Sequence, residues 1–171
     1  AAGLHPSPVA GPGVFSSPPM TSAVFPAGYL EHRLLSLELD CCILDLQARQ
    51  DMFRRLSAQP PQDGLLIAIT VPPYGNDTIA LTRYCASIGM PVAALTDRPD
   101  SPVARCAQTT LLCHVELMGM TNSFTSMVGL VDTLAMLYTF TSGAPTQEEK
   151  TCRDTLHRKF DSCFSDPNTS I

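Results

Sequence analysis

Short apolar runs alternate with segments of helical periodicity through the middle of this 171-residue chain. The apolar runs lie at 40–46, 63–70, 91–96 and 109–115. A continuous apolar run of this length, bounded by turn residues, is typical of a strand buried on both faces, as in a parallel sheet. Because parallel strands need crossover connections, the alternation predicts a doubly wound α/β domain with helices on both faces of the sheet.

Helical spacing and end signals place the helices between these strands. The sequence predicts helices at 28–37, 46–58, 76–90, 100–107 and 122–140. Asn76 or Asp77 is a suitable N-cap for the third of them, and Gly89 is a suitable C-terminal stop. In the fourth, Ser101 precedes a proline at the first helical position, where proline is favoured.

The two ends of the chain differ from this middle part. The N-terminal segment 1–25 is rich in Pro, Gly and Ser and predicts loop, with a strand beginning near Val14. The segment 144–171 starts with a capping box and carries an apolar stripe at steps of four, which predicts an amphipathic helix. We therefore expect a central domain at 26–143, flanked by these two segments.

Composition narrows the class of protein. The formal net charge is −5, and no cluster of Lys and Arg marks a surface for nucleic acid. The seven cysteines are odd in number and show no CxxC spacing, which favours reduced thiols over disulfides or a metal site. No run of about 18 apolar residues occurs, so no membrane span is expected. These features favour a cytoplasmic protein without a metal or cofactor.

The segment 122–140 is more apolar than one exposed helix should be. It contains a single acidic residue, Asp132, and no basic one. An apolar surface this wide needs more than one partner surface, so the sequence predicts a homo-oligomer, either a dimer or a tetramer.

The stretch "DGLLIAITVPPYGNDTIALTRYCASIGMPVAALTDRPDSPVARCAQTTLLCHVE" resembles the SIS (sugar isomerase) domain, most closely the effector domain of RpiR-type transcription regulators. The most specific element is "ALTDRPDSPVARCA", a strand ending in Thr-Asp before a Ser-Pro pair. The resemblance extends from about Gly28 to Phe140. It implies a flavodoxin-like, five-stranded parallel sheet, usually in the order 2-1-3-4-5, that binds phosphorylated sugars at the strand ends.

The loop after the strand 63–70 departs from the family pattern. Family members typically read Ser-x-Ser-Gly-x-Thr there, around one phosphate. Here Thr70 keeps the first hydroxyl, whereas Pro72, Pro73 and Gly75 replace the second Ser, the Gly and the Thr. Each proline removes a backbone donor. The loop therefore predicts a ligand that is less anionic than a sugar phosphate; alternatively, "PPYG" is a rigid turn with Tyr74 at a subunit contact.

The candidate ligand residues surround the crevice that opens where the strand order reverses. A helix that begins near Asn76 directs its positive end toward this crevice. The first strand and its following turn supply hydroxyls at the opposite side, although they do not align singly with the family. The candidates are Thr70, Tyr74, Gly75, Asn76, Asp77, Thr78, Ser17, Ser22, Thr96 and Asp97. Asp97 is expected either to contact the ligand or to cap the following turn.

Three functions remain open at this stage. The first is a non-catalytic sensor of a sugar or sugar phosphate, part of an RpiR-like regulator whose DNA contacts come from a separate helix-turn-helix domain absent from this chain. The second is a phosphosugar isomerase, which needs a general base; His114 and Glu116 are the candidates, and neither has a recognisable partner in the sequence. The third is an oligomerisation module with a vestigial pocket. We favour the sensor, with no catalytic residue.

Overall fold

The computed structural model of the chain describes residues 13–17, 24–116 and 123–142, together with positions 151, 154, 155 and 158. Ser22 and most of the predicted C-terminal helix at 144–171 lie outside these residues. The chain divides into two compact units, Ala1–Ala135 and Met136–Ile171, and the boundary falls inside the last long helix.

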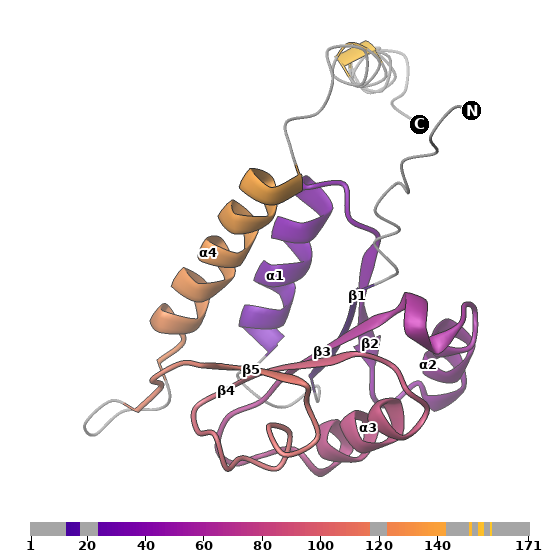
Figure 1. Ribbon diagram of the computed structural model, residues 1–171, viewed down its shortest axis with the longest axis vertical. Helices are drawn as coiled ribbons and strands as arrows, with labels where there is room; N and C mark the ends of the chain where they lie inside the picture. Colours follow the sequence, from indigo (N-terminus) through magenta and orange to yellow (C-terminus); the bar gives the residue numbers. More distant parts are fainter. Residues whose placement is uncertain are drawn as a thin grey trace, which may run out of the picture. The chain divides into compact units, whose positions relative to one another are not determined.

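Strands and helices alternate along the described chain (Figure 1). In chain order they are β1 (Gly13–Ser17), α1 (Val24–Ser36), β2 (Cys41–Asp45), α2 (Arg49–Leu56), the 3₁₀ turn η1 (Pro61–Asp63), β3 (Leu65–Ile69), α3 (Asn76–Ser87), β4 (Val92–Thr96), β5 (Thr109–Leu112) and α4 (Thr125–Ser142). The four apolar runs of the sequence correspond to β2, β3, β4 and β5.

The five strands form one parallel sheet in the order β2-β1-β3-β4-β5. From β1 the chain moves outward to β2, and it then returns past β1 to add β3 on the opposite side. The strand order therefore reverses between β1 and β3. In an open α/β sheet, this reversal opens a crevice at the carboxyl ends of the two strands.

The central strand β3 buries side chains on both of its faces, as its continuous apolar run predicts. Ile67 and Ile69 pack into a core with α1 and α4, which includes Leu30 and Met127. Leu66 lies in a second core with α2 and α3. The helices α1 and α4 thus cover one face of the sheet and α2 and α3 the other (Figure 1).

The helix α3 ends as its sequence predicts, and it begins one residue away from the predicted cap. Gly89 has φ of +80°, and Met90 N donates to Cys85 O at 3.0 Å, a left-handed glycine stop. The N-cap, however, is Gly75, and no side chain makes a capping bond there. The predicted caps Asn76 and Asp77 are instead the first two helical residues, because the extended backbone already turns helical after Gly75.

Two other helix predictions need correction. The helix predicted at 28–37 begins earlier, at Val24, so its first turn includes Pro26, which tolerates the start of a helix. The helix predicted at 100–107 is a series of turns. Arg105 N donates to Ser101 O, four residues back, at 3.2 Å, whereas Cys106 N donates to Val103 O, three residues back, at 3.1 Å. The backbone bonds thus mix two spacings and do not form a regular helix.

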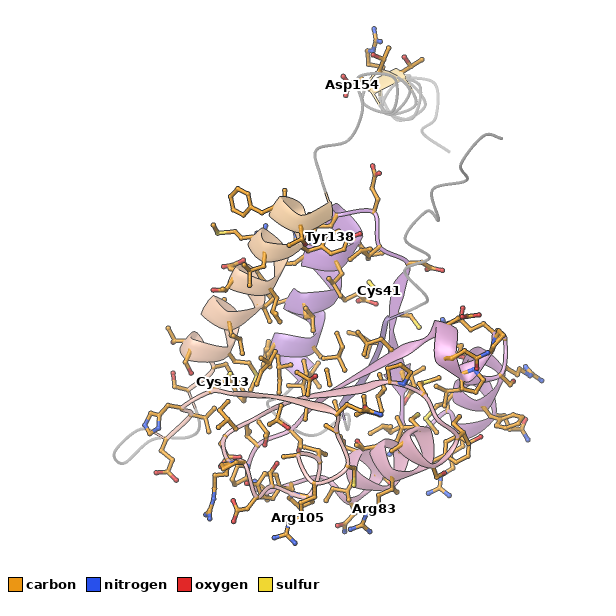
Figure 2. All side chains as sticks on the ribbon, viewed as in Figure 1. Cys41, Arg83, Arg105, Cys113, Tyr138 and Asp154 are labelled. Atoms are coloured by element: carbon orange, nitrogen blue, oxygen red, sulfur yellow. The ribbon has the colours of Figure 1, made fainter. Side chains whose placement is uncertain are left out.

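The five described cysteines are free thiols, and three of them are buried. Burial raises the pKa of Cys41 and of Cys85 to about 11, and it also raises the pKa of Cys113. Cys41 and Cys113 lie in the core between the sheet and the α1–α4 layer. Arg83 and Arg105 point away from the domain on the opposite side of the sheet, near α3 (Figure 2). These buried thiols are poor nucleophiles, so they are structural residues.

Candidate functional site

The crevice at the strand reversal is bordered by the carboxyl ends of β1 and β3. Ser17 is the last residue of β1, and Ser16 is in register with Ala68 of β3, so the backbone of Ser17 reaches this edge. Ser22 lies outside the described residues. Thr70 follows β3 directly, is 3% exposed, and its N donates to Leu95 O of β4 at 3.1 Å. The sheet thus holds Thr70 firmly at the crevice.

The N-terminus of α3 supplies backbone donors beside the crevice. The amides of the first helical turn have no acceptor within the helix, and no side chain caps them from Gly75. Thr78, in this first turn, is fully buried, and its Oγ1 has no hydrogen-bond partner among the described residues. A buried hydroxyl without a partner costs free energy, so Thr78 is the candidate residue whose environment most needs an additional polar group.

Tyr74 joins the loop after β3 to the loop after β4. Its OH donates to Asp97 Oδ1 at 2.8 Å, and Thr96 Oγ1 donates to the same oxygen at 3.2 Å. Burial, followed by the bond to Asp97, raises the pKa of Tyr74 to about 12. The phenol therefore stays neutral and holds the loop in place. Asp97 accepts these two bonds, and the capping role predicted for it has no bond in support.

The charged residues near the strand ends are largely paired with one another. Arg49, at the start of α2, lies 3.9 Å from Asp77 Oδ1. Arg98 makes two hydrogen bonds to Asp100, at 3.0 and 3.1 Å, and this lowers the pKa of that carboxyl. Each cation has a carboxylate partner, although the Arg49–Asp77 pair is long and exposed, so a phosphate dianion would compete with these carboxylates for them.

Asp77 is turned toward α2 rather than toward the crevice. It lines a groove of about 270 Å³ between α2 and α3 whose walls are mostly apolar. The other residues that line the groove are Leu46, Arg49, Met52, Phe53, Leu56, Ala80, Leu81 and Tyr84. This groove lies between the two helices on the α2–α3 face of the sheet, and Leu46, Arg49 and Asp77 place one end of it beside the carboxyl ends of β2 and β3. Asp77 is therefore the predicted site residue that the structure supports least, and Asn76 beside it is exposed.

The structure brings no catalytic constellation together in the described parts of the chain. His114 and Glu116 follow β5, and both are exposed. No group of three His, Cys, Asp or Glu side chains that could hold a metal ion occurs among the described residues. Of the helices that the structure describes, none has the length and apolar composition needed to cross a bilayer.

The contacts between different loops are the part of the site that the sequence did not reveal. The Tyr74–Asp97 bond and the Arg49–Asp77 pair each join residues from separate connections. A sequence places each residue at a strand end or helix start, but it does not tell which ends face each other. The order of the strands supplies that information, because β3 and β4 are neighbours in the sheet.

Solved structures with a similar fold include both regulators and candidate enzymes. The sugar isomerase domain of an RpiR transcription factor from Sphaerobacter thermophilus is 25% identical, with a TM-score of 0.62 over 75% of this chain and 71% of that one. A candidate phosphosugar isomerase involved in capsule formation, from Bacteroides fragilis, is 23% identical, with a TM-score of 0.64 over 84% and 76%. The Vibrio vulnificus NanR protein, complexed with ManNAc-6P, is 18% identical, with a TM-score of 0.60 over 96% and 59%.

One of the two sequence comparisons identifies a family. No curated protein sequence gives a match. A sequence profile of the SIS domain matches residues 50–137, a stretch that runs from α2 through β3, α3, β4 and β5 into α4 and spans more than half of the chain. The parallel sheet with helices on both faces fits this match. The chain therefore belongs to the SIS domain family.

Proposed function

We propose that this chain is a non-catalytic effector domain that senses a sugar or a sugar phosphate for an RpiR-like transcription regulator in the cytoplasm. The observation that carries the proposal is the similarity to the RpiR sugar isomerase domain, at 25% identity over three quarters of the chain. The structure offers donors at the strand reversal, and its described residues contain no recognisable acid–base pair. These two features fit a domain that binds a sugar ligand without converting it.

The ligand would occupy the crevice between the ends of β1 and β3. Thr70 and Thr78 supply hydroxyls there, and the first turn of α3 supplies backbone amides beside Gly75. Ser17 and Ser22 would complete the opposite wall. Ligand hydroxyls match these donors and acceptors, and an acceptor atom on the ligand would also benefit from the positive end of the helix.

The charge distribution favours a neutral or weakly anionic sugar derivative. Pro72 and Pro73 offer no N–H donors. Asp97 adds a carboxylate at the next strand end, and the nearby cations Arg49 and Arg98 are already paired. A hydrogen bond to a charged group contributes about 1.5 to 3 kcal/mol, so a dianionic phosphate loses much of its usual binding free energy here. Sugar phosphates remain the first ligands to test because the similar NanR structure is a complex with ManNAc-6P.

Regulation by such a domain requires partners. We propose that the chain forms a homo-oligomer and that DNA contacts come from a separate helix-turn-helix domain. The net charge of −5 gives the chain itself no electrostatic attraction to DNA. On α4 the side chains of Met136, Leu137 and Phe140 are exposed, at 56%, 54% and 77%, which supports self-association of that helix.

Titration with ManNAc-6P and with arabinose 5-phosphate tests the proposal, with thermal stabilisation and product analysis measured on the same samples. We expect a rise in melting temperature without conversion of either sugar, since stabilisation needs only preferential binding to the folded state. Aldose–ketose conversion that Glu116→Gln abolishes would instead identify an isomerase. Binding without conversion in that variant too is the expected control result, because Glu116 lies outside the proposed crevice.

A further inference from the structure

The groove between α2 and α3 is formed by one face of each helix (Figure 1). It is lined by positions 49, 52, 53 and 56 of α2 and by positions 77, 80, 81 and 84 of α3, the same helical spacing on both. Each face begins with a charged residue, Arg49 or Asp77, and continues with apolar or aromatic side chains. Because both helices follow parallel strands, they begin at the same edge of the sheet. The groove therefore has one charged end, and the rest of it is apolar.

The apolar part of the groove has a buried floor and an aromatic rim. Leu46, Leu56 and Leu81 are buried and form the floor. Phe53 of α2 and Tyr84 of α3 are 59% and 41% exposed, so each helix contributes one aromatic ring to the rim. The volume of about 270 Å³ lies just below the range of about 300 to 1,000 Å³ that is typical of sites for drug-sized ligands. The groove thus has the size for one small molecule with an apolar group.

The charged end of the groove consists of a long and exposed ion pair. Arg49 Nη2 lies 3.9 Å from Asp77 Oδ1, and the two side chains are 81% and 49% exposed. This distance exceeds the range of about 2.7 to 3.2 Å for a hydrogen bond, and such a pair contributes little to stability. Arg49 is also the first residue of α2, where the positive end of the helix disfavours a cation. The electrostatics of α2 therefore do not account for Arg49, and both charges are accessible to a ligand.

We propose that this groove binds a free α-amino acid with a large apolar side chain, such as leucine or phenylalanine. The ligand carboxylate pairs with Arg49, the ligand ammonium pairs with Asp77, and the side chain lies over the leucine floor between the two aromatic rings. This binding site goes beyond the proposed sugar sensing and does not rest on it.

Charge complementarity selects a zwitterion over a simple anion or cation. The ammonium and carboxylate of an α-amino acid are attached to the same carbon, so they match two opposite protein charges that lie close together. In this arrangement each charge has opposite charges as its nearest neighbours. A simple anion at Arg49 would also face the carboxylate of Asp77, and a simple cation at Asp77 would also face the guanidinium of Arg49.

The groove and the proposed sugar crevice use different residues of the first turn of α3. Asp77 lines the groove, whereas Thr78 is buried and belongs to the crevice. Arg49 and the leucine floor have no part in the crevice. Binding at the two places can therefore be measured separately on the same protein.

Titrations of the full chain with L-phenylalanine and L-leucine test the proposal, and NMR shifts of the backbone amides at 49–56 and 77–84 locate the bound molecule. We expect L-alanine to bind at least about tenfold more weakly, because it lacks the large apolar side chain. N-acetyl-L-phenylalanine lacks the ammonium and L-phenylalanine amide lacks the carboxylate, so each should bind at least about threefold more weakly than L-phenylalanine. These two compounds also represent the C-terminal and N-terminal residues of a peptide.

Exchanging one charge at a time should reverse these preferences. Arg49→Gln should weaken the binding of L-phenylalanine by at least about threefold and strengthen that of L-phenylalanine amide, because the repelling cation is gone. Asp77→Asn should likewise weaken L-phenylalanine and strengthen N-acetyl-L-phenylalanine. Ala80→Trp places a large side chain in the groove and should abolish the binding of all of them.

Matched controls change the same types of charge outside the groove. Arg83→Gln on α3 and Asp63→Asn in η1 alter residues that do not line it, so they should leave all affinities unchanged. Circular dichroism checks that each variant is folded.

Two results would overturn the inference. If neither L-phenylalanine nor L-leucine shifts the amides that line the groove, this site binds no amino acid. If N-acetyl-L-phenylalanine or L-phenylalanine amide binds the parent more tightly than L-phenylalanine, the groove recognises a single charge or the end of a peptide and not a zwitterion. Titration with ManNAc-6P on the same samples judges the sensing proposal separately, since a failure of either ligand leaves the other result intact.

Discussion

The two helical layers of this domain cover the same sheet with very different outer surfaces. On the α2–α3 layer, exposed side chains include Arg54, Arg55 and Arg83, as expected for a face in water. On α1 and the first part of α4, the exposed side chains are apolar or small apart from His32, and the few charged residues pair with groups inside the domain. The inner surfaces of both layers are apolar cores of similar kind.

The difference shows that burying a sheet face does not explain the composition of α1 and α4. Packing on the sheet requires one apolar stripe per helix, which α2 and α3 also have. The second apolar surface of the α1–α4 layer therefore needs another explanation, and the proposed self-association would supply one. The α2–α3 layer has a local apolar groove as well, but charged residues accompany it.

The largest effect is expected from the core beneath α4. Met127 is fully buried, and Met136 on the same helix is 56% exposed. Met127→Ala should lower the free energy of unfolding by about 2 to 5 kcal/mol through lost burial and a cavity. Met136→Ala should change it by less than about 0.5 kcal/mol. Urea denaturation of both variants measures this contrast; equal losses would mean that α4 is covered on both sides within one chain.

The next prediction asks which layer holds the ligand. Replacing Pro72→Ser, Pro73→Gly and Gly75→Thr together restores a family-like loop on the α3 side of the crevice. It should raise the affinity for sugar phosphates by at least about tenfold, or about 1.4 kcal/mol. Calorimetric titration measures the change. Micromolar binding by the parent with no gain in the triple variant would place the phosphate on the α1 side, at Ser16 to Ser22.

A smaller effect is expected from the polar contacts of each layer. Asp132→Ala removes the carboxylate that accepts from Tyr29 and forms an ion pair with Arg33, and it should lower the melting temperature by about 2 to 4 °C. Asp51→Ala removes an exposed pair with Arg55 inside α2, and it should shift the melting temperature by less than about 1 °C. Differential scanning calorimetry compares them. Equal shifts would show that the partly covered network between α1 and α4 is no stronger than a surface pair.

The regular parts of the fold were predictable because their signals are local. The apolar run 63–70 predicts β3 to within two residues, and Gly89 predicts the end of α3. The turns at 101–106 were mistaken for a helix because the Ser-Pro start signal is present, while the mixed spacing of the backbone bonds that follow is seen only in the folded chain. The resemblance to the SIS domain was confirmed by the sequence profile and the similar structures.

The candidate site was only partly predictable. Thr70 and Thr78 were expected near the crevice, and the structure places both in buried positions at the end of β3 and in the first turn of α3. Asp77 was expected there too, but it faces Arg49. A residue two places into a helix can point to either side, and only the packing of α2 beside α3 decides which.

The sequence by itself determined how strands and helices alternate along the chain, which strands are buried, and which loop lacks N–H donors. Each of these depends on neighbours along the chain. The tertiary structure decided that Tyr74 meets Asp97, that Thr78 Oγ1 is left without a partner, and that α1 shows an uncharged stripe. Each of these facts depends on which residues distant in sequence come to share one surface. Periodicity reveals that a helix has a face, but only packing shows whether that face is already covered.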